Sequence, residues 1–133
     1  MSTLSDLNIL IVDDVTTVRN MLVKTLKGLG AKNFFHADNV VNAWDQIDSS
    51  VESGSPIDII FSDWNMPGGD GIDLLHKIRS NENSEIRFMK FIMITGADDK
   101  VLAAMDTGSH NIIHKPFTPE MIKKKLELMY GEL

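Results

Sequence analysis

Apolar residues recur along this chain in five short runs, each about as long as a β-strand. The runs are Asn8 to Val12, Asn33 to Ala37, Ile57 to Phe61, Lys90 to Ile94 and Asn111 to His114. Because most positions within a run are apolar, the pattern predicts strands that are covered on both faces, as in a parallel sheet.

The segments between these runs have the spacing of amphipathic helices. After the first run, apolar residues stand at Val15, Val18, Leu22, Leu26 and Leu29, and near the end of the chain they stand at Ile122, Leu126, Met129 and Leu133. Strand and helix therefore alternate in five βα units, which predicts a parallel sheet with right-handed crossovers. We expect a single α/β domain that spans residues 1–133.

Residues at the predicted boundaries agree with this alternation. Thr118 is suited to cap the last helix, with Pro119 at its first position. The other expected boundaries are helix ends at Gly30 and Gly108, helix caps at Asp38 and at Asp98 or Asp99, and a turn over Gly68 to Gly71.

Polar side chains follow four of the five predicted strands. Asp13 and Asp14 come after the first strand, Asp63 after the third, Thr95 after the fourth, and Lys115 after the fifth. A single Asp at such a junction is usually a helix cap or a turn residue. Because the carboxyl ends of parallel strands meet at one edge of the sheet, their joint occurrence instead predicts a functional site.

Carboxylates held this close together repel each other, so the predicted site needs a cation to remain ionised. Oxygen ligands favour a hard ion, and two or three carboxylates suit a partly hydrated Mg²⁺ better than Ca²⁺. A carboxylate beside a divalent cation and the Lys115 ammonium is suited to attack phosphorus, with the Thr95 hydroxyl available to one phosphoryl oxygen.

Composition excludes several other classes of protein. The formal net charge of −6 disfavours binding to nucleic acid or anionic lipid through bulk charge. The chain has no Cys, which excludes disulfides and is consistent with a reducing compartment. No apolar stretch approaches the ~20 residues that span a bilayer, and no signal peptide is apparent. We therefore expect a cytoplasmic monomer that binds neither nucleic acid nor membranes.

Together these motifs resemble the response-regulator receiver domains of the CheY type. The resemblance covers nearly the whole chain and rests on four segments: Ile9 to Asp14, Ser62 to Pro67 followed by Asp70 and Gly71, Ile94 to Gly96, and Lys115 to Phe117. It implies a flavodoxin-like, doubly wound, five-stranded parallel sheet of strand order 2-1-3-4-5. It also implies a signalling switch, rather than a conventional enzyme, that catalyses its own phosphotransfer and autodephosphorylation.

The resemblance assigns a role to each site residue. It implies that Asp63 accepts a phosphoryl group from a histidine kinase and that Lys115 and Thr95 contact that group. It further implies that Mg²⁺ is held by Asp14 directly, by Asp13 chiefly through water, by Asp63, and by the backbone carbonyl of Asn65. The peptide bond between Lys115 and Pro116 is expected to be cis.

One departure from the family concerns the output of the switch. Ile112 occupies a position that is commonly Tyr or Phe, so the usual rotation of an aromatic ring is not available. The implied partners are a histidine kinase, a phosphatase and the flagellar motor switch in chemotaxis, and Ile112 counts against the last of these. A phosphorelay shuttle, a phosphate sink or a regulator of a non-motor target are the alternatives.

Two rival classes also place their sites at the edge of a parallel sheet. An aspartate-nucleophile phosphatase of the haloacid-dehalogenase type has an Asp-x-Asp-x-Thr motif, whereas Asp13 and Asp14 are adjacent here. A flavin binder of the flavodoxin type needs a phosphate-binding first loop, which in this chain is acidic and lacks glycine.

Overall fold

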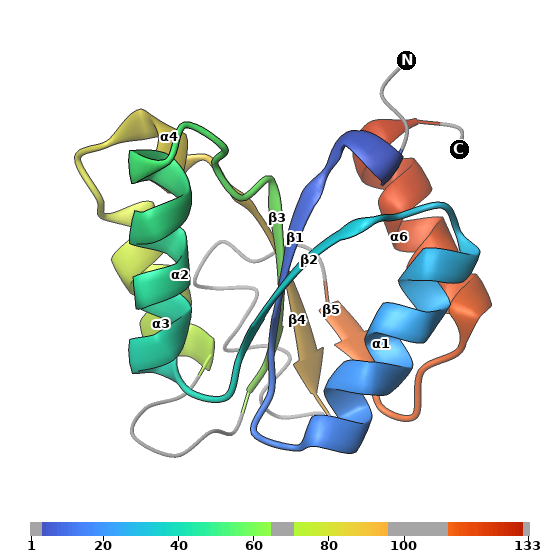
Figure 1. The fold of residues 1–133 in the computed structure, drawn as a ribbon. Helices are drawn as coiled ribbons and strands as arrows, with labels where there is room; N and C mark the ends of the chain where they lie inside the picture. Colours follow the sequence, from blue (N-terminus) through green and yellow to red (C-terminus); the bar gives the residue numbers. More distant parts are fainter. Residues whose placement is uncertain (1–3, 65–70, 96–111, 132–133) are drawn as a thin grey trace.

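A computed structural model describes residues 4–64, 71–95 and 112–131. Its centre is a five-stranded parallel sheet of order β2-β1-β3-β4-β5, which confirms the predicted doubly wound, flavodoxin-like arrangement (Figure 1). The strands are β1 (Asn8–Val12), β2 (Asn33–Ala37), β3 (Ile59–Asp63), β4 (Lys90–Thr95) and β5 (Ile112–His114).

Helices cover both faces of this sheet. On one face lie α1 (Thr16–Gly28) and α6 (Pro119–Tyr130), and on the other lie α2 (Val40–Glu52), α3 (Gly71–Arg79) and the short α4 (Ser84–Arg87) (Figure 1). A 3-10 turn, η1 (Leu4–Asp6), precedes β1. Within the described ranges, none of the helices has the length and apolar character that crossing a membrane requires.

The strands divide their side chains between two hydrophobic clusters. In β1, Ile9 and Ile11 belong to the cluster under α1 and α6, whereas Leu10 and Val12 belong to the cluster under α2 and α3. Successive side chains of a strand point to opposite faces, so a continuous apolar run supplies both clusters. This division explains why the predicted strands are apolar at nearly every position.

The boundary of β3 differs from the sequence prediction. The apolar run predicted a strand from Ile57 to Phe61, whereas β3 covers Ile59–Asp63. Its two polar residues stay in the ladder because Ser62 pairs with Met93 and Asp63 with Ile94 of β4. Asp63 is consequently the last residue of a buried strand and not part of the loop after it, so its backbone is fixed by sheet hydrogen bonds.

Several predicted helix boundaries are confirmed, and one predicted helix cap is wrong. Thr118 caps α6 by accepting a hydrogen bond from the N–H of Met121, and Gly30 follows α1 with a φ of 112°. The cap of α2 is Asn39, not Asp38, because the Asn39 side chain accepts from the N–H of Asn42. The predictions at Asp98, Asp99 and Gly108 lie outside the described residues.

Gly71 packs against the end of β3 and is the first residue of α3, whereas the sequence placed it in a turn that began at Gly68, a position outside the described residues. Its N–H donates to the carbonyl oxygen of Trp64 at 2.8 Å. A Cβ at this position would lie 2.5 Å from the carbonyl oxygen of Asp63 and 2.8 Å from the sulfur of Met93. Only glycine lets α3 begin this close to the strand end that carries Asp63.

We therefore expect Gly71→Ala to lower the free energy of unfolding by about 1–3 kcal/mol, which is typical of overpacking against backbone and core atoms. Urea denaturation measures the change. The control is Gly28→Ala, because an added Cβ at Gly28 meets no atom within 4 Å and alanine favours a helix by up to about 1 kcal/mol. Equal stability of the Gly71 variant and the parent would contradict this close contact.

Candidate functional site

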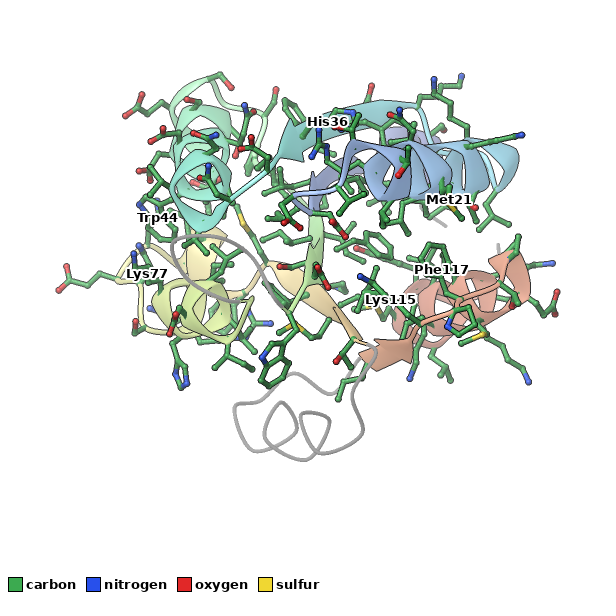
Figure 2. All side chains as sticks on the ribbon, turned by 90° about the horizontal axis from the view of Figure 1, so that it is seen from below. Met21, His36, Trp44, Lys77, Lys115 and Phe117 are labelled. Carbon is green, nitrogen blue, oxygen red and sulfur yellow. The ribbon has the colours of Figure 1, made fainter. Side chains whose placement is uncertain are left out.

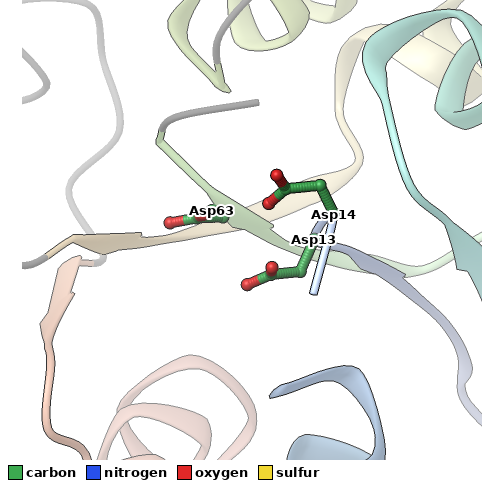
Figure 3. A group of neighbouring side chains, drawn as sticks. All are labelled: Asp13, Asp14 and Asp63. Carbon is green, nitrogen blue, oxygen red and sulfur yellow. The ribbon is translucent and has the colours of Figure 1, made fainter. Parts of the chain in front are cut away.

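Three aspartates meet at the carboxyl end of the sheet, and we call Asp13, Asp14 and Asp63 the acidic site. One carboxylate oxygen from each residue lies within 4.8 Å of those of the other two. Figure 3 shows the three side chains directed toward a common space. The structure thus brings together residues that are fifty positions apart in the sequence, because β1 and β3 are neighbours in the sheet.

Lys115 lies beside two of these carboxylates. Its Nζ donates to Oδ1 of Asp63 at 3.0 Å and lies 3.8 Å from Oδ2 of Asp13. The Lys115 N–H donates to the carbonyl oxygen of Thr95 at 2.8 Å, which ties the loop after β5 to the end of β4. Figure 2 views the molecule from this end and shows where the Lys115 side chain lies.

The two oxygens of the Asp63 carboxylate have different surroundings. Oδ1 accepts hydrogen bonds from Lys115 Nζ and from the N–H of Trp64, the latter at 2.9 Å. Within the described residues, no donor contacts Oδ2. One oxygen therefore anchors the side chain, and the other is left for an incoming group.

Asp13 is buried, with only 1% of its surface exposed. Its N–H donates to the carbonyl oxygen of Ala37, and its Oδ1 accepts from the N–H of Val15 at 2.8 Å. Asp13 is thus both a turn residue and a member of the acidic site, so it has the usual role of an Asp after a strand and the functional role as well. Asp14, in contrast, is exposed.

Burial raises the pKa of the Asp13 carboxyl. The Val15 hydrogen bond lowers the pKa, the charge of Asp63 raises it, the Lys115 ammonium lowers it, and the charge of Asp14 raises it. The raised pKa means that the neighbouring groups do not fully offset the cost of a buried charge. An additional cation at the acidic site would favour the ionised form.

The donor set of the acidic site fits Mg²⁺. Its donors are carboxylate oxygens, which hard divalent cations prefer, and the exposure of Asp14 leaves room for water ligands. Lys115 alone supplies too little positive charge for three carboxylates. Within the part of the chain that the structure describes, these residues form the only group of acidic, His or Cys side chains with spacing suited to a metal ion.

The other predicted site residues are placed as follows. Thr95 is buried at the end of β4, and Ile112 is half-buried in β5. The Lys115–Pro116 peptide bond is cis, the conformation that the family resemblance implies. Asn65, whose carbonyl is the expected fourth metal ligand, lies outside the described residues.

The two tryptophans differ in burial. Trp64 follows the acidic site directly, and only 8% of its surface is exposed. It belongs to the cluster under α2 and α3, whereas Trp44 is half-buried against that cluster. The backbone N–H of Trp64 serves Asp63 while the side chain fills the core.

The sequence did not identify Arg19 as a site residue, yet its guanidinium contacts the loop that carries Asp13 and Asp14. Its Nη1 donates to the carbonyl oxygen of Asp13, and its Nη2 donates to Oγ of Thr16 at 3.1 Å. A basic residue one helical turn after an acidic pair is the signal that could have identified it.

Comparison with known proteins gives consistent matches over most of the chain. The model of the response regulator receiver domain matches residues 9–127. Chemotaxis protein CheY1 of Helicobacter pylori is 37% identical over 127 residues, which cover 94% of this chain and 98% of that protein. A chemotaxis protein CheY homolog of Campylobacter jejuni is 35% identical over 127 residues, which cover 94% of this chain and 93% of that protein.

A solved structure agrees with these matches. Chemotaxis response regulator CheY4 of Vibrio cholerae superposes with a TM-score of 0.76 at 27% sequence identity. The superposition covers 92% of this chain and 97% of that one.

The raised pKa of Asp13 predicts how stability depends on pH when divalent cations are absent. Between the pKa of the unfolded chain, near 3.8, and the higher pKa of the folded protein, the folded state holds more protons. The free energy of unfolding therefore falls as pH rises through this window. We expect Asp13→Asn, which removes the buried charge, to be more stable than the parent at pH 7 and to lose this advantage below about pH 4.

Thermal unfolding in EDTA across this pH range measures the effect. Asp48→Asn is the matched control because Asp48 is exposed on α2 and its substitution changes the net charge by the same amount. A variant at position 13 that is less stable than the parent at pH 7 would show that the ionised carboxylate stabilises the fold.

Proposed function

The chain belongs to the response regulator receiver domain family and is a chemotaxis-type response regulator, and we propose that Asp63 is the residue on which it accepts a phosphoryl group. The observation that carries this assignment is the asymmetric Asp63 carboxylate. Oδ1 is held by Lys115 and by the N–H of Trp64, whereas no donor from the described residues contacts Oδ2. Such an oxygen is positioned as a nucleophile.

Phosphorylation by a histidine kinase is the general function of the family. In the proposed step, Oδ2 of Asp63 attacks the phosphorus of a phosphohistidine, and a P–O bond forms as the P–N bond breaks. The imidazole leaves with the electron pair of the broken bond and takes up a proton. The product is an acyl phosphate on a strand end whose backbone is fixed by the β3–β4 ladder.

The proposed metal ligands are Asp13, Asp14 and Asp63, with the carbonyl of Asn65 as a further oxygen donor. When bound, Mg²⁺ supplies positive charge that offsets the carboxylates and the oxygens of the transferred group. Receiver domains use Mg²⁺ at this acidic pocket. The three carboxylates are spaced to share one ion, which supports the same use here.

Lys115 and Thr95 are the proposed contacts of the phosphoryl oxygens. The Lys115 ammonium already lies between Asp63 and Asp13, so a phosphoryl group on Asp63 would meet it without a large movement. Thr95 ends the neighbouring strand, where Ile94 is paired with Asp63. Donors fixed before the reaction stabilise developing negative charge at low reorganisation cost.

The test of the acceptor is labelling with acetyl phosphate, a small phosphodonor. We expect Mg²⁺-dependent incorporation that hydroxylamine removes, as it does from acyl phosphates, and we expect Asp63→Asn to abolish it. Asparagine keeps the shape of the side chain but lacks a nucleophilic carboxylate. Peptide mapping by mass spectrometry locates the label.

Asp58→Asn is the matched control, because Asp58 precedes β3 at the opposite end from the acidic site. This variant should be labelled like the parent. A label that persists in Asp63→Asn, or that maps to a histidine, would reject Asp63 as the acceptor.

The proposed partners are a histidine kinase, a phosphatase and, in chemotaxis, a flagellar switch protein, all met in the cytoplasm by a monomeric receiver domain that spans residues 1–133. We further propose that the chain catalyses its own dephosphorylation, and no direct binding to nucleic acid is part of the proposal. Relatives named for chemotaxis support the choice of the flagellar switch. Ile112 counts against tight binding, so a phosphorelay shuttle, a phosphate sink or a non-motor target remains a second candidate.

We expect the beryllofluoride-treated protein to bind a flagellar switch peptide weakly and Ile112→Tyr to bind it about tenfold more tightly, as an added aromatic anchor does in interfaces. Ile112 is half-buried, so a larger ring at this position has access to the surface. Fluorescence anisotropy of a labelled peptide measures the affinity. Ile112→Val is the control and should bring no gain, whereas tight binding by the parent would show that no aromatic residue is needed.

A further inference from the structure

The N-terminus of α1 lacks the side-chain cap that usually fixes such a junction. Val15 occupies the cap position, and its side chain forms no capping hydrogen bond. In the described chain, α2 and α6 are instead capped by Asn39 and Thr118. The loop that carries Asp13 and Asp14 therefore needs another attachment to the helix that follows it.

Arg19 provides this attachment from the first turn of α1. Its Nη1 donates to the carbonyl oxygen of Asp13, and its Nη2 donates to Oγ of Thr16 at 3.1 Å. The guanidinium thus joins Asp13, the first residue of the loop after β1, to Thr16, the first residue of the helix. It spans the same junction that a side-chain cap would fix.

Together with two other contacts, Arg19 holds residue 13 at three points. The Asp13 N–H donates to Ala37, its Oδ1 accepts from the N–H of Val15, and its carbonyl oxygen accepts from Arg19. The carbonyl of Asp13 and the N–H of Asp14 share one planar peptide group. Fixing this carbonyl therefore fixes the direction in which the chain enters Asp14.

We propose that Arg19 is a positioning residue for metal binding, because its hydrogen bond to the Asp13 carbonyl orients the peptide that places Asp14 toward Asp63. This inference rests on the proposed function, since it takes the acidic site to be the Mg²⁺ site. Asp14 depends most on this peptide, because no residue of the described chain forms a hydrogen bond to its exposed carboxylate. The groups that orient metal ligands typically change metal affinity by about 10–100-fold when they are substituted.

The chemistry of the side chain accounts for an arginine at this position. A guanidinium is planar and carries donors in a fixed fork, so it can serve the Asp13 carbonyl and the Thr16 hydroxyl at once. A lysine offers the same charge as a single flexible ammonium. Arg19→Lys therefore separates the effect of the fork from the effect of the charge.

His36 provides a probe of where the Arg19 guanidinium lies. Both residues line an open pocket of about 280 Å³ between α1 and α2, which Asp38 and Asp45 also line. The pKa of His36 is lowered, first by partial burial and then by the charge of Arg19. Figure 2 shows His36 at this end of the sheet, beside α1 and α2.

The experiment compares Mg²⁺ binding by calorimetry in the parent, Arg19→Lys and Arg19→Gln. We expect both variants to bind Mg²⁺ about tenfold more weakly. NMR titration should show a higher pKa of His36 in Arg19→Gln, because the neighbouring cation is removed while Asp38 and Asp45 remain. Thermal unfolding in EDTA identifies the temperature range in which each variant is folded, and binding is measured within that range.

Arg79→Lys is the matched control. The Nη1 of Arg79 also donates to two backbone carbonyl oxygens, those of Arg87 at 2.9 Å and Met89 at 2.7 Å, but it does so at the end of α3, away from the acidic site. Its substitution should lower thermal stability and leave Mg²⁺ affinity unchanged. A similar loss of affinity in Arg19→Lys and Arg79→Lys would overturn the positioning role, because the effect would then follow stability alone.

The outcomes distinguish this inference from the proposed function. Asp14→Ala removes a proposed ligand and should abolish binding. If the parent binds Mg²⁺, Asp14→Ala does not, and Arg19→Lys binds like the parent, the positioning role is wrong and the metal site stands. If the parent itself fails to bind Mg²⁺, both are wrong. An unchanged pKa of His36 in Arg19→Gln would contradict the position of the guanidinium on which the inference depends.

Discussion

Repulsion among the carboxylates of Asp13, Asp14 and Asp63 is the constraint on which the rest of the structure depends. One oxygen of each lies within 4.8 Å of those of the other two, and Asp13 is buried. Holding like charges this close costs free energy, so the backbone must keep them in place. The parallel sheet meets this requirement. Its ladders fix Asp63 and Val12, the residue before Asp13, and two hydrophobic clusters fix the sheet between its helices.

Three backbone contacts around the acidic site also help to hold its residues in place. The N–H of Lys115 is tied to Thr95, so the ammonium that offsets part of the charge is placed by main-chain hydrogen bonding. Gly71 lets α3 begin against the carbonyl of Asp63, where a Cβ would clash. Arg19 contacts the carbonyl of Asp13. Each contact holds a polar group of the site through the main chain, which leaves carboxylate oxygens available to a cation or a phosphoryl group.

The fold was largely predictable because the central strands β1, β3 and β4 are mostly apolar on both faces and the helices have regular spacing. The errors arose where polar residues interact through the main chain. Ser62 and Asp63 were placed beyond β3, yet they stay in its ladder because β4 continues beside them. Asp38 is the predicted cap of α2, but the cap is Asn39, because both residue types are good caps and only the start of the helix distinguishes them. Arg19 was missed because its partner is a backbone carbonyl, and the spacing of a basic residue after an acidic pair does not show which atom it contacts.

Main-chain hydrogen bonds fix the residues of the acidic site, whereas contact with a target depends on side chains at the surface. The residues proposed to carry the chemistry, such as Asp63 and Lys115, are fixed by strand ladders and a short backbone hydrogen bond. Ile112 differs in kind, since it is a half-buried side chain that packs against the cluster under α2 and α3. Substitution at residue 112 can alter the surface near β5 while the acidic site keeps its geometry, because no hydrogen bond of that site passes through the Ile112 side chain. Relatives with one shared chemistry can therefore differ in the targets they contact.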